Sequence, residues 1–309
     1  MKILLTGGAG FIASHICDRL ICEGHEVVVI DNLSTGRLEL LNPRAYFYQL
    51  DLCDPAIALV FQIEKPELVI HHAAQVSVNN SWDNPVFDAV TNIIGSLNLF
   101  ENCRQYKVKK IIYASSAAIY GEPLYLGIDE KHPVKPLSFY GLSKYLAEIY
   151  LKYYAGLFGL KFTILRYANV YGPRQRSDGE GGVVAIFLSS LLKGEAPVIF
   201  GQGEQSRDFI YVADIVEANI QALTRAENEV LNLGTGKELS INQLYASLKE
   251  LLCSQLQPVY VPERPGDIMH SYFDQRKAAE LLDWEPSYPL QEGLCKTIEY
   301  DRGARHLSC

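Results

Sequence analysis

The sequence of 309 residues lacks the patterns that identify several classes of protein. Its seven cysteines include no Cys-x-x-Cys pair and no Cys/His group at zinc spacing, so they indicate buried thiols of an intracellular protein. No run reaches the roughly 20 apolar residues that a membrane-spanning helix needs. The formal net charge is −8, and no Lys/Arg cluster suits nucleic-acid phosphates. We therefore expect no metal, no membrane and no nucleic-acid partner.

Low-complexity tracts and internal repeats are also missing. The composition, 48% hydrophobic and 21% charged, is that of an ordinary globular protein with a large core. Residues 1–5 form an apolar run that is too short for a signal peptide and lead directly into a glycine-rich turn. These features together predict a cytoplasmic protein.

Short apolar runs separated by longer amphipathic segments dominate the first half of the chain. Uninterrupted apolar strands that alternate with helices are typical of a parallel sheet covered on both faces. The predicted fold class is therefore α/β, with a doubly wound parallel (Rossmann) sheet. The predicted strands span residues 3–5, 27–30, 45–50, 68–71, 110–114 and 162–165, and the two longest helices span 85–106 and 139–158.

A glycine-rich loop follows the first strand, where dinucleotide-binding proteins hold a pyrophosphate. Gly7 and Gly10 permit a tight turn, and the helix that begins near Phe11 offers free N–H groups. Asp31 ends the second strand about twenty residues further on, where a carboxylate can bond both ribose hydroxyls and repel a 2′-phosphate. The loop and Asp31 together predict NAD, rather than NADP, as the cofactor.

Beyond about residue 169 the pattern loosens, with glycine, proline and loop residues between shorter elements. Residues 207–218 look like a strand running into a helix, and residues 230–233 like a strand that returns to the sheet. We predict an NAD-binding Rossmann domain over 1–168, with return segments near 207–235. The remainder, mainly 169–309, is predicted to form a smaller, interleaved C-terminal α/β lobe for the substrate.

Tyr140 and Lys144 stand four residues apart, which places them on one face of a predicted helix. A free phenol has a pKa of about 10, and a nearby ammonium lowers this pKa by stabilising the phenolate. Tyr140 could then exchange a proton with a substrate hydroxyl. Tyr and Lys at this spacing also occur by chance on many helices, so the interpretation depends on the rest of the chain.

The glycine loop, Asp31, Ser116 and Tyr140-x-x-x-Lys144 occur here in the order typical of the extended short-chain dehydrogenase/reductase family. The chain resembles this family of NAD-dependent epimerases and dehydratases over essentially its whole length, and it is most similar to the UDP-glucose (UDP-galactose) 4-epimerase branch. Ala13 departs from the pattern, because the family usually has glycine there. The other motifs that carry the resemblance are His71-His72-Ala73-Ala74-Gln75, Asn92-Ile-Ile-Gly95, Ser115-Ser-Ala-Ala-Ile-Tyr-Gly121, Leu165-Arg-Tyr-Ala-Asn-Val-Tyr-Gly-Pro-Arg174, Arg207-Asp-Phe-Ile-Tyr211 and Arg264-Pro-Gly-Asp267.

The resemblance implies contacts for many of these residues. The residues implied to bind NAD are Gly7, Gly10, Phe11, Ile12, Asp31, Asn32, Asp51, Leu52, Ala73, Ala74, Asn92, Tyr140, Lys144 and Tyr167. Those implied to hold the nucleotide-sugar are Ser116, Tyr140, Asn169, Arg207, Arg264 and Ser271. Arginine suits a diphosphate because its guanidinium binds the oxygens in a bidentate fashion, although a surface salt bridge is the alternative for either arginine.

The implied reaction is a transient oxidation at C4 of a UDP-sugar, with Tyr140, Lys144 and Ser116 as the catalytic residues. Tyr140 would take the C4-hydroxyl proton, Ser116 would bond the same oxygen, and Lys144 would lower the pKa of the tyrosine. The 4-keto sugar would turn about its anchored diphosphate and take the hydride back from NAD on its other face. The expected function is therefore that of a UDP-hexose 4-epimerase.

Related enzymes that begin with the same oxidation carry further proton-transfer groups beside the serine. Where Ala117 and Ala118 stand, the 4,6-dehydratases have an Asp-Glu pair, and at Ala118 the decarboxylases have a glutamate and the 3,5-epimerases a cysteine. Alanine cannot transfer a proton. Another nucleotide-sugar epimerase (UDP-glucuronate 4-epimerase or CDP-hexose 2-epimerase type), a dehydratase and a non-catalytic NAD-binding module stay open as alternatives.

The resemblance also implies a substrate gate and a homodimer. A small residue four positions after Asp267 would admit N-acetylhexosamines, and the count gives Ser271, although Tyr272 adjoins it. The two long helices would pair with those of a second subunit in a four-helix bundle. The apolar residues expected there, which could instead face the chain's own sheet, are Leu97, Phe100, Leu146, Tyr150 and Tyr153.

Overall fold

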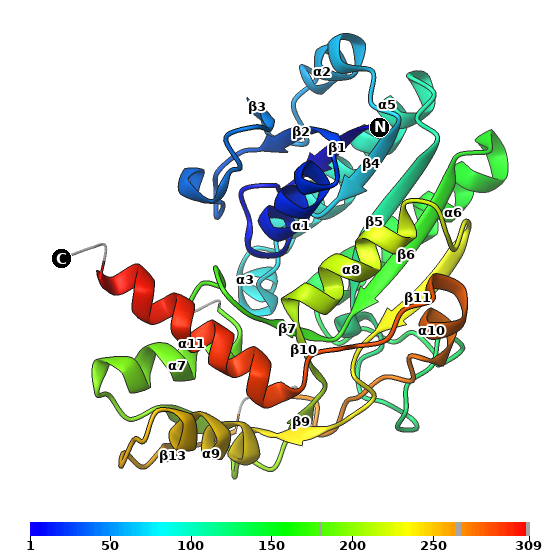
Figure 1. The fold of residues 1–309 in the computed structure, drawn as a ribbon. Helices are drawn as coiled ribbons and strands as arrows, with labels where there is room; N and C mark the ends of the chain where they lie inside the picture. The colour runs from blue at the N-terminus through cyan, green and yellow to red at the C-terminus, as the bar shows by residue number, and fades with distance from the viewer. Residues whose placement is uncertain (179–180, 264–266, 307–309) are drawn as a thin grey trace.

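The computed structural model describes residues 1–178, 181–263 and 267–306. Its centre is a sheet of seven strands in which all neighbours run parallel (Figure 1). The order across the sheet is β11-β6-β5-β4-β1-β2-β3, which is the predicted doubly wound arrangement. The strands are β1 (Lys2–Thr6), β2 (Glu26–Asp31), β3 (Tyr46–Gln49), β4 (Leu68–His71), β5 (Lys110–Ser116), β6 (Lys161–Tyr167) and β11 (Glu229–Leu233).

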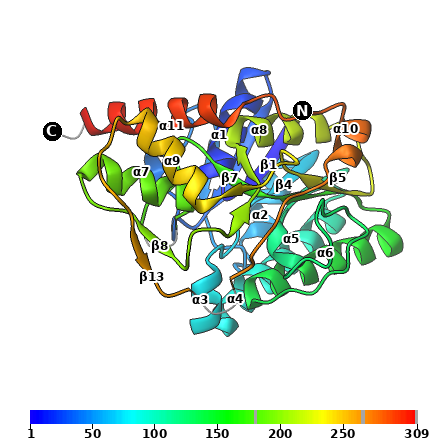
Figure 2. The same ribbon diagram turned by 90° about the horizontal axis from the view of Figure 1, so that it is seen from below.

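Helices cover both faces of this sheet, as Figure 2 shows. The helices packed on one face are α1 (Phe11–Cys22), α8 (Val212–Ala222) and α10 (Arg276–Leu282). Those on the other face are α2 (Ile57–Glu64), α5 (Gly95–Gln105) and α6 (Phe139–Phe158). Leu4 and Leu5 of β1 are both fully buried, one in each of the two apolar clusters. Because each such side chain contributes roughly 1.5–3 kcal/mol, the continuous apolar strands fix this layered arrangement.

The strand order reverses beside β1, and this reversal positions the site. From β1 the chain builds outward to β2 and β3, and then returns to place β4 on the other side of β1. In open α/β sheets, ligands bind at the carboxyl ends of the strands at such a switch point. The strands end there at Thr6, Asp31, His71, Ser116 and Tyr167.

The two long predicted helices are present. Helix α6 spans the predicted range, with Ser138 accepting a hydrogen bond from Gly141 N (3.1 Å) at its start and Gly159 in the left-handed region at its end. The predicted helix 85–106 is helical almost throughout, but a π-helical turn interrupts it. Its parts are α4 (Pro85–Ala89), the π turn Val90–Ile94 and α5, and the short α3 (Val78–Asp83) precedes them.

The residues predicted for a dimer surface on these helices face in different directions. Phe100 is fully buried in the chain's own core, so its assignment to a subunit interface is wrong. Leu97 is partly buried against the same core, and Leu146 is half-buried. Tyr150 and Tyr153 are 42% and 64% exposed and remain available to a partner.

Shorter elements form a second group around their own apolar cluster. They are β7 (Asn169–Tyr171), α7 (Val183–Lys193), β8 (Val198–Phe200), β9 (Ser206–Arg207), β10 (Phe209–Tyr211), β12 (Leu239–Ser240), α9 (Ile241–Leu251), β13 (Val259–Val261) and α11 (Leu290–His306). Helix α8 and strand β11 fall between these elements in the sequence, but α8 packs beside α1 and β11 pairs with β6. The chain therefore returns to the sheet after leaving it. The predicted domain limits, 1–168 and 169–309, stay a prediction.

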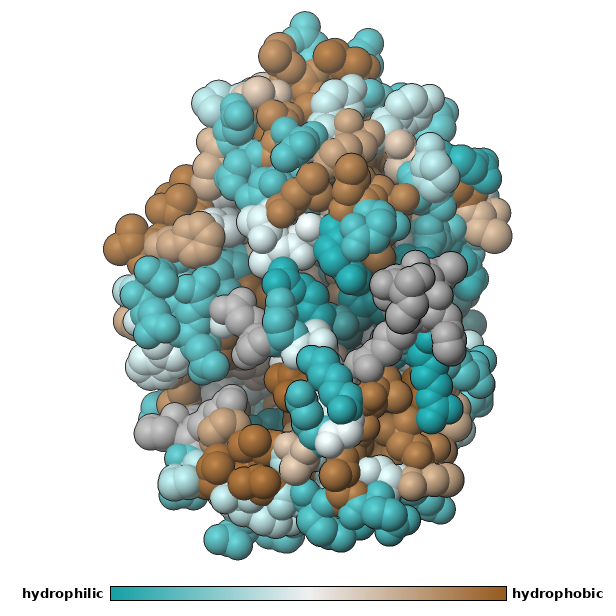
Figure 3. All heavy atoms as spheres, turned by 90° about the vertical axis from the view of Figure 1, so that its left-hand side faces the viewer, coloured by the Kyte–Doolittle hydropathy of each residue, from teal (hydrophilic) through white to brown (hydrophobic). Residues whose placement is uncertain are grey.

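The described residues also include two short 3-10 turns, and their surface mixes hydrophobic and hydrophilic side chains. Two 3-10 turns span Leu38–Leu40 and Ala117–Ile119. On the face that Figure 3 shows, hydrophobic side chains in brown form separate patches among hydrophilic ones in teal. No described helix has both the length and the apolar character needed to cross a membrane.

Candidate active site

The loop between β1 and α1 forms a cradle of backbone atoms. Gly7 has φ +71°, and a Cβ at this position would lie only 2.8 Å from the backbone nitrogen of Ala73. Gly10 is the N-cap of α1 and has no side chain to cap it, so the N–H groups of the first turn, which begins with Phe11 and Ile12, are left for a ligand or water. A helix N-terminus of this kind favours anions. These residues therefore fit a bound pyrophosphate.

The ends of β2 and β3 bring together the residues predicted for the adenosine half of NAD. Asp31 is buried, and its carboxylate accepts hydrogen bonds from Ala9 N (3.0 Å) and Leu33 N (2.8 Å). Burial raises the pKa of this carboxyl. Asn32 Nδ2 donates to Asp51 Oδ2 over 2.7 Å. Asp31 thus lies directly beside the glycine loop, while its contact with the ribose stays a prediction.

Asn92 lies in the π turn and connects it to two other elements. Its side chain accepts from Gln75 N (2.8 Å), and its Nδ2 lies within hydrogen-bonding distance of Gln75 O, Asp88 Oδ1 and Ser143 Oγ. Asn92 is itself buried, so these bonds hold it beneath the surface at this edge of the sheet. Asp88 is also buried, and its Oδ2 has no hydrogen-bonding partner among the described residues. Asp88 and Ser143 were not predicted as site residues, because their proximity to Asn92 depends on how α4 packs against α6.

Other residues predicted for NAD lie at the ends of neighbouring strands. Tyr167 is buried at the end of β6, with its hydroxyl 3.0 Å from His72 Nε2. Leu52 is buried after β3, and Ala73 and Ala74 are half-buried after β4. The structure therefore gathers these residues at the carboxyl edge of the sheet.

The turn after β5 and the start of α6 meet closely at this edge. Ser116 ends β5, and Tyr140 is the second residue of α6. A Cβ at Gly141 would overlap the carbonyl oxygen of Ala118, so the missing side chain is what allows α6 to approach this turn. Burial raises the pKa of Tyr140, and a hydrogen bond with Ser116 opposes this rise. The structure thus brings two of the three predicted catalytic residues close together.

Lys144 is the third predicted catalytic residue and is 4% exposed. Its Nζ lies 4.3 Å from the centre of the Tyr113 ring. Burial lowers the pKa of Lys144 to about 7, opposed by the charges of Glu148 and Asp88. Lys144 is therefore only a partial source of positive charge at neutral pH. We predicted a lowered pKa for Tyr140, but the residues of the protein by themselves raise it.

Two of the residues predicted for the nucleotide-sugar lie on neighbouring segments, Asn169 at the start of β7 and Arg207 at the end of β9, just before β10. Asn169 stands opposite Phe209, two residues after Arg207, and is exposed. Arg207 Nη1 donates to two backbone carbonyls, one of them that of Ile268 at 2.6 Å. No carboxylate among the described residues lies within ion-pair distance of Arg207, which removes the surface salt bridge as its explanation. Arg264 lies outside the described residues.

The segment that contains Ser271 runs beside β9, because Ser206 N donates to Met269 O over 2.8 Å. The neighbouring Tyr272 is directed towards the loop at Gly127, where an added Cβ would lie 3.8 Å from the tyrosine ring. Ser271 is half-buried. Its role as a gate for the sugar stays a prediction.

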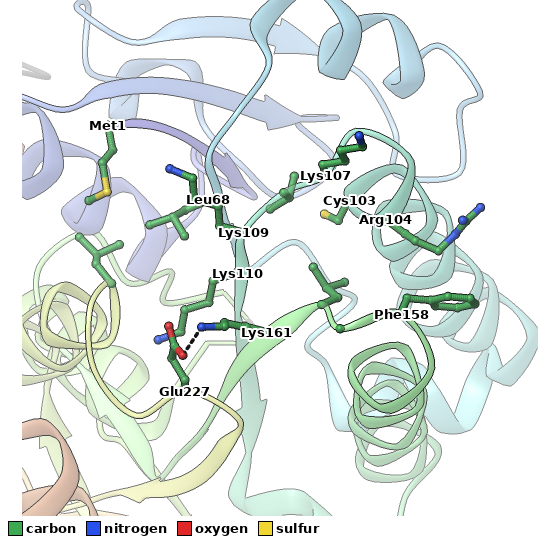
Figure 4. Close-up of a pocket in the computed structure, with 14 residues that line it drawn as sticks. Met1, Leu68, Cys103, Arg104, Lys107, Lys109, Lys110, Phe158, Lys161 and Glu227 are labelled. Atoms are coloured by element: carbon green, nitrogen blue, oxygen red, sulfur yellow. Dashed lines mark hydrogen bonds and ion pairs between the residues drawn. The ribbon is translucent and has the colours of Figure 1, made fainter.

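A cavity of about 530 Å³ lies at the opposite, amino-terminal edge of the sheet (Figure 4). Its lining includes several basic side chains, and most of these have partners. Lys161 pairs with Glu227 over 2.5 Å, and Lys109 pairs with Glu67 over 2.7 Å. None of the predicted site residues lines this cavity. The candidate active site is therefore the carboxyl edge of the sheet.

A Rossmann sheet with this cradle and a Ser, Tyr and Lys at its carboxyl edge defines an extended short-chain dehydrogenase/reductase. Residues 3–234 match the model of the NAD dependent epimerase/dehydratase family. The chain belongs to this family, and NAD is its cofactor.

Three relatives show how far the similarity extends. A UDP-glucose 4-epimerase from Thermotoga maritima, solved with UDP-glucose, is 49% identical with a TM-score of 0.98, over 99% of this chain and 100% of that chain. A UDP-glucose 4-epimerase from Mycolicibacterium smegmatis is 40% identical over 98% of this chain and 99% of its own length. A UDP-N-acetylglucosamine 4-epimerase from Methanobrevibacter ruminantium, solved in complex with UDP-N-acetylmuramic acid, is 38% identical with a TM-score of 0.94, over 98% of each chain.

Proposed function

We propose that this protein is a UDP-hexose 4-epimerase that interconverts UDP-glucose and UDP-galactose. The observation that carries the proposal is that Tyr140, at the start of α6, lies near Ser116, beside a turn whose side chains, Ala117 and Ala118, cannot transfer protons. Such a site can move one proton at one hydroxyl, but it lacks an acid and a base for elimination. The similarity to two UDP-glucose 4-epimerases supports the same reaction.

The catalytic residues divide the work at the C4 oxygen. Tyr140 accepts the hydroxyl proton and later returns it, Ser116 holds the same oxygen by a hydrogen bond, and the ammonium of Lys144 stabilises the phenolate. The chemistry that NAD supplies when bound is the reversible acceptance of a hydride, together with the positive charge of its oxidised ring. Burial raises the pKa of Tyr140. The proposed base, Tyr140, therefore needs the positive charge of the oxidised NAD ring in addition to that of Lys144.

Arg207 anchors the diphosphate in this proposal. Its two bonds to backbone carbonyls both use Nη1, so Nε and Nη2 retain N–H groups for a ligand. Asn169 adds a polar side chain at the adjacent strand. An anchor at the diphosphate leaves the sugar free to turn and to present its other face.

The test is turnover of UDP-galactose without an added reductant. Purified protein supplied with NAD should form UDP-glucose, and the Tyr140→Phe variant should lose this activity by roughly 10²–10⁴-fold. Formation of a 4-keto-6-deoxy sugar would indicate a dehydratase instead. No turnover of any UDP-hexose, UDP-glucuronate or CDP-hexose would favour a non-catalytic NAD-binding module.

The proposed pocket also accepts UDP-GlcNAc and UDP-GalNAc. Ser271 is small, and the bulkier Tyr272 is directed towards the loop at Gly127. The similarity to a UDP-N-acetylglucosamine 4-epimerase supports this breadth. The Ser271→Tyr variant should lose activity on the acetylated pair while keeping activity on UDP-galactose. Equal loss on both pairs would contradict the assignment of Ser271 as the gate.

The proposed assembly is a homodimer formed by α4, the π turn and α6. Large apolar side chains on these elements are exposed: Val86 (75%), Phe87 (52%), Ile94 (53%), Tyr153 (64%) and Leu157 (71%). A patch of this kind is typical of a subunit interface. Sedimentation of the wild type as a dimer and of Leu157→Glu as a monomer would support the proposal, and a monomeric wild type would contradict it.

A further inference from the structure

Glu148 lies on the same face of α6 as the catalytic residues, two turns after Tyr140 and one turn after Lys144. Its side chain is fully buried. Glu148 Oε1 accepts hydrogen bonds from Ser115 Oγ (2.6 Å) and Arg166 Nε (3.0 Å), and Oε2 accepts one from Arg166 Nη2 (2.6 Å). Both oxygens of this buried side chain therefore have hydrogen-bond donors.

The partners of Glu148 connect the elements that carry the site. Ser115 directly precedes Ser116 on β5 and stands opposite Arg166 on β6. Arg166 Nη1 donates to Tyr120 Oη (2.7 Å), and Tyr120 in turn donates to Asn232 Oδ1 (2.7 Å) on β11. One buried network therefore joins α6, both strands beneath it and the turn that follows Ser116.

The surroundings of Lys144 contain few groups that can hold its charge. Those facing it are Tyr140 and Glu148 on α6, Asp88 on α4, Tyr113 on β5, and His71 and His72 at the end of β4. Burial depresses the pKa of both histidines, so they are neutral at pH 7. Lys144 Nζ makes no hydrogen bond to another residue in the described part of the chain, and it lies over the ring of Tyr113. Glu148 and Asp88 are therefore the anions that oppose deprotonation of Lys144, and Glu148 is the larger of the two influences.

We infer that Glu148 is a positioning residue of this site, whose buried carboxylate fixes Ser116 and α6 in register and keeps Lys144 as an ammonium beside Tyr140. The kinetic part of this inference rests on the proposed function, whereas the part concerning the charge of Lys144 does not. A purely structural ion pair with Arg166 would account for the contacts of Glu148. If Glu148 served only this ion pair, removal of its carboxylate would leave the charge state of Lys144 unchanged.

The test replaces Glu148 by glutamine, which retains the shape and one acceptor but removes the charge. The negative charge of Glu148 raises the pKa of Lys144, so its removal lowers that pKa and the ammonium is lost at a lower pH. We expect the alkaline limb of the kcat profile to move to lower pH by about one unit. At pH 8 kcat should fall roughly tenfold, with a smaller loss at pH 6 and a KM for UDP-galactose within about twofold of the wild type. Arg166 and Lys152, which face Glu148 itself, remain in place.

A second readout is independent of turnover. Competitive acetylation of the protein without substrate, followed by mass spectrometry of the Lys144 peptide, gives the pH midpoint at which this amine becomes reactive. We expect a lower midpoint in Glu148→Gln than in the wild type. If the wild type turns over no UDP-sugar, the proposed function fails while this measurement still decides the inference.

Two further variants separate charge from packing. Asp214→Asn removes another buried carboxylate, which on α8 accepts hydrogen bonds from Ser287 and Tyr288, so it should lower stability without moving the Lys144 midpoint. Ser115→Ala removes the link to β5 but keeps the charge of Glu148, so it should lower kcat by the same factor at pH 6 and at pH 8. An unchanged midpoint in Glu148→Gln, with a loss of kcat that is uniform across pH, would overturn the inference.

Discussion

Lys110 and Lys144 are both buried lysines near opposite edges of the same sheet, but their ammonium groups have different surroundings. Lys110, 3% exposed, donates to the carbonyl oxygens of Ala222 (2.5 Å) and Arg225 (2.6 Å) at the end of α8. Lys144, 4% exposed, lies over the ring of Tyr113 with no acceptor among the described residues. Burial lowers the pKa of both, to about 8 for Lys110 and about 7 for Lys144.

The difference shows that burial of a charged group does not by itself mark a functional site. The N–H groups of Lys110 satisfy carbonyls at a helix end, where a cation is favourable. Those of Lys144 are not used within the described chain, although an ammonium carries three donors. Lys144 Nζ is not one of the enclosed polar atoms that lack a partner, so water or a ligand can reach its donors. We therefore assign Lys110 to stability and Lys144 to the bound cofactor and substrate.

The strongest test of this assignment is Lys144→Met. The variant should lose roughly 100-fold or more in kcat for UDP-galactose, because the phenolate of Tyr140 loses its stabilising ammonium. Its melting temperature should equal or exceed that of the wild type, since the substitution removes a charged group that burial disfavours. A variant that stays active but unfolds more easily would break the comparison.

The matched substitution is Lys110→Met. It leaves the carbonyls of Ala222 and Arg225 without their donor, so the free energy of unfolding should fall by about 1–3 kcal/mol in urea titrations. The kcat of the folded protein should be close to that of the wild type, because Lys110 lies at the edge away from Tyr140. A large loss of kcat with unchanged stability would reverse the two roles.

The carboxyl edge should also be the acid-sensitive one, because the buried His71 and the half-buried His72 lie there. Burial lowers the pKa of His72 to about 3 and that of His71 well below its usual value. Below pH 6.5 the unfolded chain binds protons that the folded protein does not, so stability falls as the pH drops from 6.5 towards 3. Between pH 7.5 and pH 5 each histidine should cost about 2 kcal/mol. Urea titrations at both pH values should show a smaller acid loss in His72→Gln, and an equal loss would contradict this account.

The smallest effect is expected from the paired cations of the amino-terminal cavity. Lys161→Gln removes an exposed ion pair with Glu227 and should change the free energy of unfolding by less than about 1 kcal/mol. Activity on UDP-galactose should not change. A loss of activity in this variant would indicate that the cavity in Figure 4 affects the active site. It would contradict the assignment of function to the carboxyl edge alone.

Much of the fold was predictable because its signals are local. The apolar run of β4 begins and ends at the predicted residues, 68 and 71, and α6 spans the predicted 139–158. Strand ends follow from short apolar runs, and helix ends follow from caps such as Ser138 and Gly159. The glycine loop and Asp31 were identified for the same reason, since the motif is contiguous or nearly so.

The parts that the sequence did not predict depend on which faces meet. Phe100 looked suited to a subunit interface, but the apolar pattern of a helix cannot tell the chain's own core from a partner, and Phe100 packs in the core. Asp88 joins the site through its contacts with Asn92 and Gln75, which come from other segments of the chain. Glu148 was visible at a spacing of two turns from Tyr140, but its partners Ser115 and Arg166 come from other strands.

The close approach of Gly141 to the Ala118 carbonyl also bears on how this scaffold could be redesigned. The backbone of the turn Ala117–Ile119 is held from both sides, by the hydrogen bond from Ala118 N to Ser116 Oγ (3.2 Å) and by the helix packed against it. The methyl groups of Ala117 and Ala118 are half-buried and hold nothing in place through hydrogen bonds. Acids or bases could therefore be introduced here without breaking a hydrogen bond, most readily at Ala118, because Ala117 packs against an apolar cluster. The identity of the product would then be a property of two replaceable positions, separate from the frame that presents the sugar.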